Sequence, residues 1–361
     1  PLLEYAQGNP LTITMLVGQA LRENLSTKEQ IKKHVEMLRA GETEIQDDER
    51  LGRSKSLGAS LSYGFQHAFD DFEREIIALL YFFQGFVHVD VLMCILDPGT
   101  PWHIKDLRSP TREEVIKLLN RANEVGLLKV LDGCYCSVHP ALPWYFKKLF
   151  DHYYKGRENE AVKAFVEAVS SFGEYLFKEY SNGNRGAISF LAVEESNLLY
   201  AIQLALKNDL WGQAVSAMTG IRILYEYEGR WMEWKRLVEE IEPFYLDPYT
   251  GGPIAGRENG WNVVSNSKIR LAWESRQFDK AQGLLPNYLK WSYMQAEKYL
   301  INGPKELDEV GQATIMNYIV SLEESGHIQR EMNNSECIRN YQKSFEVRKR
   351  FMRLRLRPQS L

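Results

Sequence analysis

The chain has 361 residues, of which 44% are hydrophobic and 25% charged, and its formal net charge is −4. This length predicts two or three domains, and the acidic balance argues against a protein that binds nucleic acid through its overall charge. Four cysteines are too few for a disulfide framework in a chain of this size, so reduced thiols and a cytoplasmic location are expected. No signal peptide is visible in these residues, and no segment approaches the roughly 18 uninterrupted apolar residues of a membrane helix, so no membrane span is predicted.

Residues 1–50 predict a small helical piece. The chain opens at Pro1 within a helical pattern, from which we expect it to be a fragment of a larger protein. Residues 11–24, LTITMLVGQALREN, carry Leu11, Met15, Ala20 and Leu21 near helical spacing, and Asn9-Pro10 supplies a cap and a first-turn proline. The polar stretch GETEIQDDERLGRSKS that follows is typical of a linker.

Residues 55–157 predict a winged helix, in which three helices are followed by a β-hairpin and a closing helix. Asp70 with Glu73 forms a capping box before FEREIIALLYFF, and HVDVLMCIL reads as a second, short helix. Thr111 with Glu114 forms another capping box before the third helix, which Gly126 ends. LLKVL and CYCSV then read as two strands joined by a tight turn at residues 132–133.

Residues 160–361 predict an α-α superhelix of tetratricopeptide (TPR)-like repeats, which makes the fold class mainly α. A shared local pattern, a small or polar turn followed by an aromatic residue, recurs in NDLWGQA, EGRWMEW and SRQFDKA, and more weakly in SGHIQRE. Helix pairs that repeat such a turn bury their faces against neighbouring pairs. A Gly/Pro-rich loop at residues 245–259 interrupts the period and is either a binding insertion or a slack connector.

Three short motifs, taken in their order along the chain, resemble the STAND class of signalling ATPases, which includes the NB-ARC proteins. GNPLTITML at residues 8–16 is similar to the family's GxPLA motif, and YCSVHPAL at residues 135–142 is similar to its strand-end histidine motif. EESNLLYAIQLAL and YEYEGRWMEW resemble the first TPR helices of STAND proteins. The resemblance covers most of residues 5–290.

The resemblance implies a regulatory arm of a nucleotide-dependent switch. It implies that Pro10 lies near the adenine and that His139 contacts the β-phosphate of bound ADP, which holds a closed, inactive state. It also implies a protein or peptide ligand on the repeats, an upstream nucleotide-binding domain that takes ADP or ATP with Mg²⁺, and oligomerisation on activation. An imidazole suits such a contact because its charge is tunable near neutral pH.

The parts that would hydrolyse ATP are missing from this sequence. It contains no GxxxxGK[ST] phosphate loop, and no hydrophobic strand ends in the paired acidic residues that hold Mg²⁺. We also find no Ser–His–Asp pattern and no HExxH motif. Glu194-Glu195 and Glu239-Glu240 are expected to be solvated. We therefore expect no enzymatic activity and no bound cofactor from this chain alone.

Several alternatives stay open at this point. His139 could simply be a packing or capping residue before Pro140, or it could join Cys134 and Cys136 in a zinc site, although a fourth ligand is missing. The third helix of the winged helix carries Arg112, Lys117 and Arg121 among three glutamates, so its charge cancels and DNA binding is not expected.

Two other functions compete with the switch. One is a stand-alone helical-repeat scaffold that binds its partner without switching, and the other is a winged-helix transcription regulator with a TPR ligand arm. The basic end of the chain, VRKRFMRLRLR, is either a solvated last helix or a surface for anions, RNA or membranes. Most aromatic residues of the repeats are expected in the core, and those left exposed are candidate anchors for a peptide.

Overall fold

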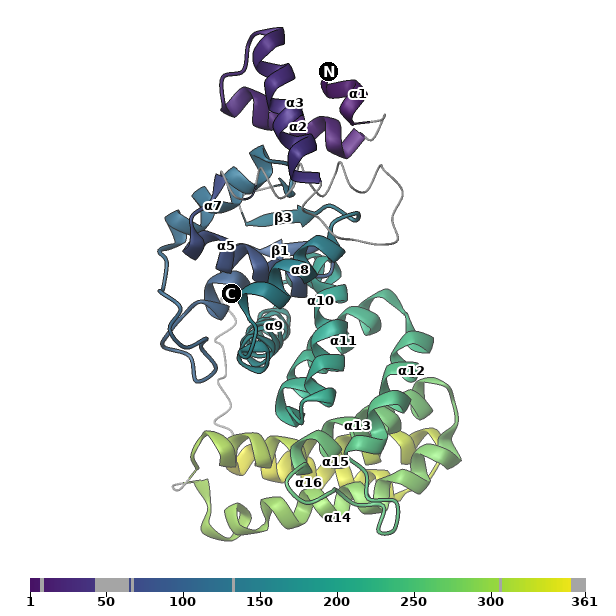
Figure 1. Cartoon of the computed structure of the whole chain (residues 1–361). Helices are drawn as coiled ribbons and strands as arrows, with labels where there is room; N and C mark the ends of the chain where they lie inside the picture. The colour runs from purple at the N-terminus through teal and green to yellow at the C-terminus, as the bar shows by residue number, and fades with distance from the viewer. Residues whose placement is uncertain (7–9, 43–64, 66–67, 132–133, 305–306, 352–361) are drawn as a thin grey trace, which may run out of the picture. The chain divides into compact units, whose positions relative to one another are not determined.

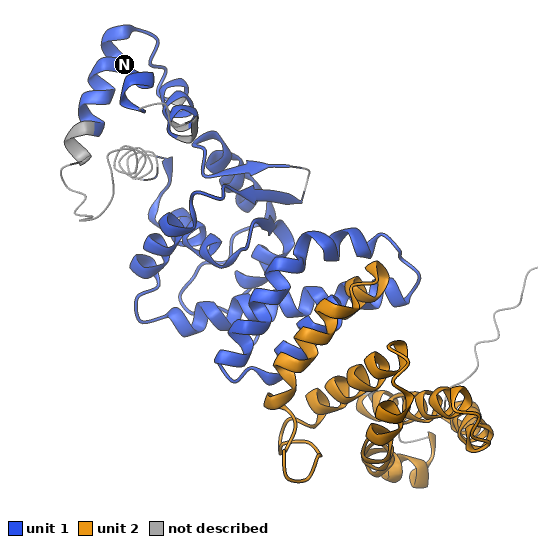
Figure 2. Ribbon diagram, turned by 90° about the vertical axis from the view of Figure 1, so that its right-hand side faces the viewer, with its two compact units in different colours: residues 1–221 blue, residues 222–361 orange. Residues whose placement is uncertain are grey.

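The computed structural model describes residues 1–6, 10–42, 65, 68–131, 134–304 and 307–351. The chain is mainly α with one small antiparallel sheet, as the sequence predicts (Figure 1). It forms two compact units, residues 1–221 and 222–361 (Figure 2), and the division between them falls inside one helix. The domain bounds expected from the sequence, 1–50, 55–157 and 160–361, stay predictions. No helix within the described residues is long and apolar enough to cross a membrane.

The first unit begins with three helices, α1 (Leu2–Tyr5), α2 (Pro10–Arg22) and α3 (Lys28–Glu42). Tyr5, Leu16 and Leu38 are fully or nearly fully buried in their shared apolar core. The predicted cap at Asn9 and most of the predicted linker lie outside the described residues.

Two of the next helices, α5 (Asp71–Ala78) and α7 (Arg112–Glu124), begin at the predicted capping boxes, and both boxes are confirmed. These elements are α5 (Asp71–Ala78), the 3₁₀ turn η1 (Leu79–Phe82), β1 (Phe86–His88), α6 (Val89–Ile95), α7 (Arg112–Glu124), β2 (Leu128–Val130), β3 (Tyr135–Val138) and α8 (Pro143–Tyr153). The helix expected to continue through FEREIIALLYFF changes to 3₁₀ after Ala78. Gly126 follows α7 with a φ of 79°, the left-handed conformation expected of a residue that ends a helix.

The sheet has three antiparallel strands in the order β1-β3-β2, and the sequence did not predict β1. The predicted hairpin strands β2 and β3 pair with each other, and their turn at residues 132–133 lies outside the described residues. β1 pairs with the free side of β3, with His88 opposite Tyr135. The element order is otherwise the one that led us to predict a winged helix.

The basic side chains of α7 are engaged in ion pairs. Arg112 Nε lies 2.9 Å from Asp90 Oδ1, and Lys117 Nζ lies 2.8 Å from Glu113 Oε1. Arg121 donates to both carboxylate oxygens of Glu73, at 2.9 and 2.7 Å. Phosphate contacts dominate DNA affinity, so a helix whose cations are already paired is poorly suited to bind DNA.

The first unit ends in long helices, α9 (Glu158–Ser181), α10 (Ala187–Lys207) and α11 (Trp211–Glu228), of which α11 continues into the second unit. α9 and α11 approach closely at two buried glycines, because a Cβ on Gly220 would lie 3.1 Å from the carbonyl oxygen of Gly173. α9 also packs against α6, and α10 packs against β1. The β1 edge of the sheet therefore contacts α10, and the helix that follows β1 contacts α9.

The second unit contains α12 (Trp231–Ile241), the 3₁₀ turn η2 (Glu242–Phe244), α13 (Glu258–Glu274), α14 (Phe278–Asn302), α15 (Glu309–Glu331) and α16 (Glu336–Phe351). Successive helices from α12 onward pack against each other, which is the pairing expected of TPR-like repeats. Ala296, Ile315, Ile319 and Leu322 are the centre of one core between α14 and α15, and Val347 of α16 joins it.

Three of the four predicted repeat turns are confirmed. Asp209, Gly229 and Arg276 each adopt positive φ and end a helix. In each turn the next residue donates its N–H to a carbonyl five positions back, as Leu210 does to Ala205 at 2.9 Å. The fourth prediction, SGHIQRE, is wrong because residues 325–331 lie inside α15.

The fourth turn lies instead at Asn333, where φ is 55°. Ser325 and Gly326 are small because α16 packs closely there. A Cβ on Gly326 would lie 2.8 Å from the ring of Tyr341, and Asn340 donates to the Ser325 hydroxyl at 3.0 Å.

The loop at residues 245–259 is an ordered connector. Ile254 donates to the carbonyl of Tyr245 at 2.9 Å, and Leu246 and Pro253 form an isolated β-bridge. Tyr245 is fully buried against Gly260, whereas Tyr249 is 97% exposed. The loop therefore has a fixed base and presents one exposed aromatic side chain.

Candidate regulatory site

His139 lies directly after β3 and is exposed. Its Nδ1 accepts a hydrogen bond from the backbone N–H of Ala141 at 3.1 Å, and its carbonyl oxygen accepts one from Leu142 at 2.9 Å. The capping contact considered as an alternative role of His139 is therefore present, in the turn before α8. Because Nδ1 is the acceptor, the proton of a neutral imidazole resides on Nε2, which can donate to an external oxygen.

A cavity of about 580 Å³ lies beside His139. Its walls come from the η1–β1 segment, the end of β3, the start of α8, and α10. They include Tyr81, Gln84, His139, Tyr200 and Gln203. Burial, with the neighbouring Tyr81, raises the pKa of Tyr200 to about 12, so its hydroxyl stays protonated near neutral pH. None of the described residues that line this cavity is a lysine, an arginine or a carboxylate.

Asn197 joins α10 to the first strand of the sheet. Its side-chain oxygen accepts from the N–H of Gln84 at 2.7 Å, and its Nδ2 donates to the carbonyl of Phe86 at 2.9 Å. Nδ2 also lies 2.8 Å from Oε2 of Glu194, to which it donates. Asn197 is 1% exposed, so one buried amide satisfies backbone groups on both sides of Gly85.

Glu194 is fully buried, and the expectation that it lies on a solvated face is therefore wrong. Burial raises the pKa of its carboxyl group despite the hydrogen bond from Asn197. Among the described residues, neither its Oε1 nor the nearby buried hydroxyl of Tyr135 has a hydrogen-bond partner of good geometry. The pKa of Tyr135 is also raised, first by burial and then by the carboxylate of Glu194.

The two residues predicted to contact ADP are His139 and Pro10. His139 fits a phosphate contact, because its imidazole is exposed and Nδ1 is already used within the chain. The described residues of the adjoining cavity include no cationic side chain to pair with a phosphate, so we expect a phosphate to lie outside it. Pro10 is the first residue of α2, and only its backbone is described. Its predicted contact with adenine therefore stays a prediction.

The structure does not gather the zinc ligands considered from the sequence. Cys136 is buried within β3, opposite Val87 and Val130, whereas Cys134 is half-buried just before the strand. His139 is exposed at the opposite end of β3.

Most of the aromatic residues expected in the core of the repeats are at least partly buried. Tyr225 and Trp234 are buried, and Trp231, Trp273 and Trp291 are half-buried. Tyr227 is 61% exposed on α11, so it is a candidate anchor for a peptide.

Sequence reasoning missed the junction at Asn197. Glu194 and Asn197 are three residues apart on α10 and therefore lie on the same face of the helix. This spacing was the one feature of the sequence that pointed to a polar contact between them. The backbone partners of Asn197, at Gln84 and Phe86, are more than 100 residues away, beyond the reach of any local pattern.

No protein-family model and no curated protein matches the chain. Among solved structures, it is similar to a Signal Transduction ATPase with Numerous Domains (STAND) protein with a tetratricopeptide repeat sensor from Pyrococcus horikoshii. The match has 13% sequence identity and a TM-score of 0.29, and it covers 94% of this chain and 53% of the other. The chain thus spans about half of the length of that protein, and a likeness at this level assigns neither a family nor the role of any residue.

Proposed function

We propose that this chain is the winged-helix and sensor portion of a STAND-type switch protein. The observation that carries the proposal is the arrangement around α10. One face of this helix holds the sheet through Asn197, and its neighbouring turns line the same cavity as His139. Val138, next to His139, donates to the carbonyl of Gly85 at 2.8 Å, between the two backbone groups that Asn197 holds. A displacement of α10 would therefore strain the segment that positions His139.

In this proposal the closed state contains ADP in an upstream nucleotide-binding domain, and His139 donates from Nε2 to a phosphate oxygen. A protein or peptide ligand binds the repeats, with exposed aromatics such as Tyr227 as anchors. The ligand favours the open state only by its differential affinity for the two states. Opening breaks the His139 contact, releases ADP and permits oligomerisation. The chain itself carries out no catalysis in this mechanism.

The paired cations of α7 favour this proposal over a transcription regulator. Arg112, Lys117 and Arg121 already lie against carboxylates, so few charges are available for phosphate contacts.

The proposal predicts that His139→Ala weakens nucleotide retention. The protein would be expressed from its complete reading frame, and bound ADP and its dissociation rate would be measured for the wild type and the variant. Loss of a charge-assisted contact is expected to speed dissociation about tenfold or more, since such a bond contributes about 1.5–3 kcal/mol.

His152→Ala is the matched control, because His152 is also an exposed histidine of the same segment, on α8. It should leave ADP dissociation unchanged. A purified protein that neither contains nor binds nucleotide, or one in which His139→Ala behaves like the control, would contradict the proposed switch.

A further inference from the structure

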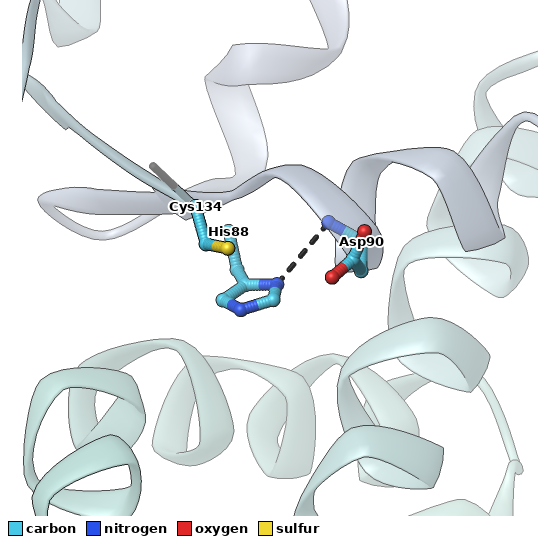
Figure 3. A group of neighbouring side chains, drawn as sticks. All are labelled: His88, Asp90 and Cys134. Atoms are coloured by element: carbon cyan, nitrogen blue, oxygen red, sulfur yellow. Dashed lines mark hydrogen bonds between the residues drawn. The ribbon is translucent and has the colours of Figure 1, made fainter. Parts of the chain in front are cut away.

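A second cluster of polar side chains lies where β1 passes into α6. A ring nitrogen of His88, a carboxylate oxygen of Asp90 and the sulfur of Cys134 all lie within 4.8 Å of one another (Figure 3). The backbone fixes these positions, because Val89 donates to the carbonyl of Cys134 at 2.9 Å and Asp90 donates to Nδ1 of His88 at 3.2 Å.

The cluster is rigid on one side and open on the other. His88 is 5% exposed, and its ring packs against Tyr135 and Phe172 with centroid distances of 4.6 and 4.7 Å. Asp90 is exposed and Cys134 is half-buried, so both can adjust by side-chain rotation. Because Nδ1 of His88 accepts a hydrogen bond, it carries the lone pair of the neutral imidazole. An ion that enters from solvent would bind Nδ1 and replace the 3.2 Å hydrogen bond from the Asp90 N–H.

The donor set has the chemistry of a zinc site. Nitrogen, oxygen and sulfur donors together suit Zn²⁺, whereas Mg²⁺ and Ca²⁺ prefer oxygen alone. Tetrahedral zinc with bonds of roughly 2.0–2.3 Å needs donors about 3–4 Å apart, a modest contraction from the observed spacing. Three protein ligands leave a fourth position for water.

Arg112 already places a positive charge at this cluster. Its Nε donates to Asp90 Oδ1 at 2.9 Å, and a terminal nitrogen lies 3.7 Å from the sulfur of Cys134. The guanidinium thus pairs with two of the three possible ligands. Its side chain is 46% exposed, which allows it to turn into solvent when a divalent cation takes its place.

We propose that His88, Asp90 and Cys134 form a zinc-binding site that Arg112 occupies when the metal is absent. The site differs from the one considered from the sequence, with which it shares only Cys134. Because it is formed entirely by this chain, it does not depend on the proposed nucleotide switch.

The test is a titration of the full chain with Co²⁺, a spectroscopic substitute for Zn²⁺, followed by displacement with Zn²⁺, all in a phosphine reductant. The expected result is one equivalent of Co²⁺ with a thiolate-to-cobalt charge-transfer band. Cys134→Ser should abolish the band, and Asp90→Asn should weaken binding about tenfold or more, with circular dichroism to check folding. Arg112→Gln should bind several-fold more tightly, because it removes the competing charge.

Cys337→Ser is the control, because Cys337 is a half-buried thiol of the other unit, and it should leave the band unchanged. The absence of the band from both the wild type and Arg112→Gln would overturn the proposal. Its survival in Cys134→Ser would overturn it as well.

Discussion

The two ring nitrogens of His139 have different surroundings. Its Nδ1 accepts from the backbone of the segment that leads into α8, and the imidazole is exposed, so Nε2 can donate to another group. The position of this residue was predictable, because strand alternation ends at Val138 and Pro140 follows directly. The position of Asn197 against β1 was not, because it depends on contacts between segments distant in sequence.

The buried carboxyl group of Glu194 should make the stability of the folded protein depend on pH. Because burial raises the pKa of its carboxyl group, the folded state binds the proton more tightly than the unfolded state. The native state is therefore favoured as the pH falls from neutral towards the unfolded pKa of about 4.3, and it loses this contribution as the pH rises through the folded pKa. Glu194→Gln removes the titration and keeps an acceptor for Asn197.

We expect the stability of Glu194→Gln relative to the wild type to be most favourable at pH 7 and to decline towards pH 5. The measurement is urea unfolding of both proteins at the two pH values, with exposed Glu36→Gln as the control. A stability difference that stays constant between pH 7 and pH 5 would show that Glu194 does not titrate abnormally.

At the scale of single elements, local chemistry decided which predictions succeeded. The capping boxes at Asp70 and Thr111 were predictable because all of their partners lie within three residues. The turn predicted at SGHIQRE was wrong because small residues occur both in turns and where two helices pack closely. Gly326 allows α16 to approach α15, and it does not end a helix.

The close approach of α9 and α11 predicts opposite effects for two glycines of the same helix. A Cβ on Gly220 would lie 3.1 Å from the carbonyl oxygen of Gly173, whereas one on exposed Gly212 would meet nothing within 4 Å. Gly220→Ala should therefore destabilise the protein by about 1–3 kcal/mol through overpacking. Gly212→Ala should stabilise it by about 0.5–1 kcal/mol, because alanine loses less backbone entropy.

Chemical denaturation of the two variants, monitored by far-ultraviolet circular dichroism, provides the comparison. Equal effects of the two substitutions would mean that the helices do not approach as described.

At the scale of the whole molecule, the spacing of apolar residues and the recurring turn pattern were sufficient to predict the mainly α class and most of the repeat turns. It was insufficient for β1, a three-residue strand whose pairing with β3 is a long-range contact. The same pairing explains why the zinc ligands considered first were wrong. β1 brings His88 and Asp90 to Cys134, whereas β3 separates Cys134 from His139 along its length.

The proposed switch requires energetic coupling between the helical array and the nucleotide contact. Such coupling is reciprocal, so breaking the junction between α10 and β1 should alter nucleotide affinity even though Asn197 is not placed at the nucleotide. Asn197→Ala leaves the N–H of Gln84 and the carbonyl of Phe86 without this partner, at a cost of about 1–3 kcal/mol each if they stay buried.

The most direct measurement is the ADP dissociation rate of Asn197→Ala, alone and combined with His139→Ala, in protein expressed from the complete reading frame. Circular dichroism would establish that each variant is folded. If the junction positions His139, Asn197→Ala accelerates ADP release, and the double variant releases ADP no faster than the faster single variant. A folded Asn197→Ala protein that releases ADP at the wild-type rate would contradict the coupling between the array and the strand-end histidine.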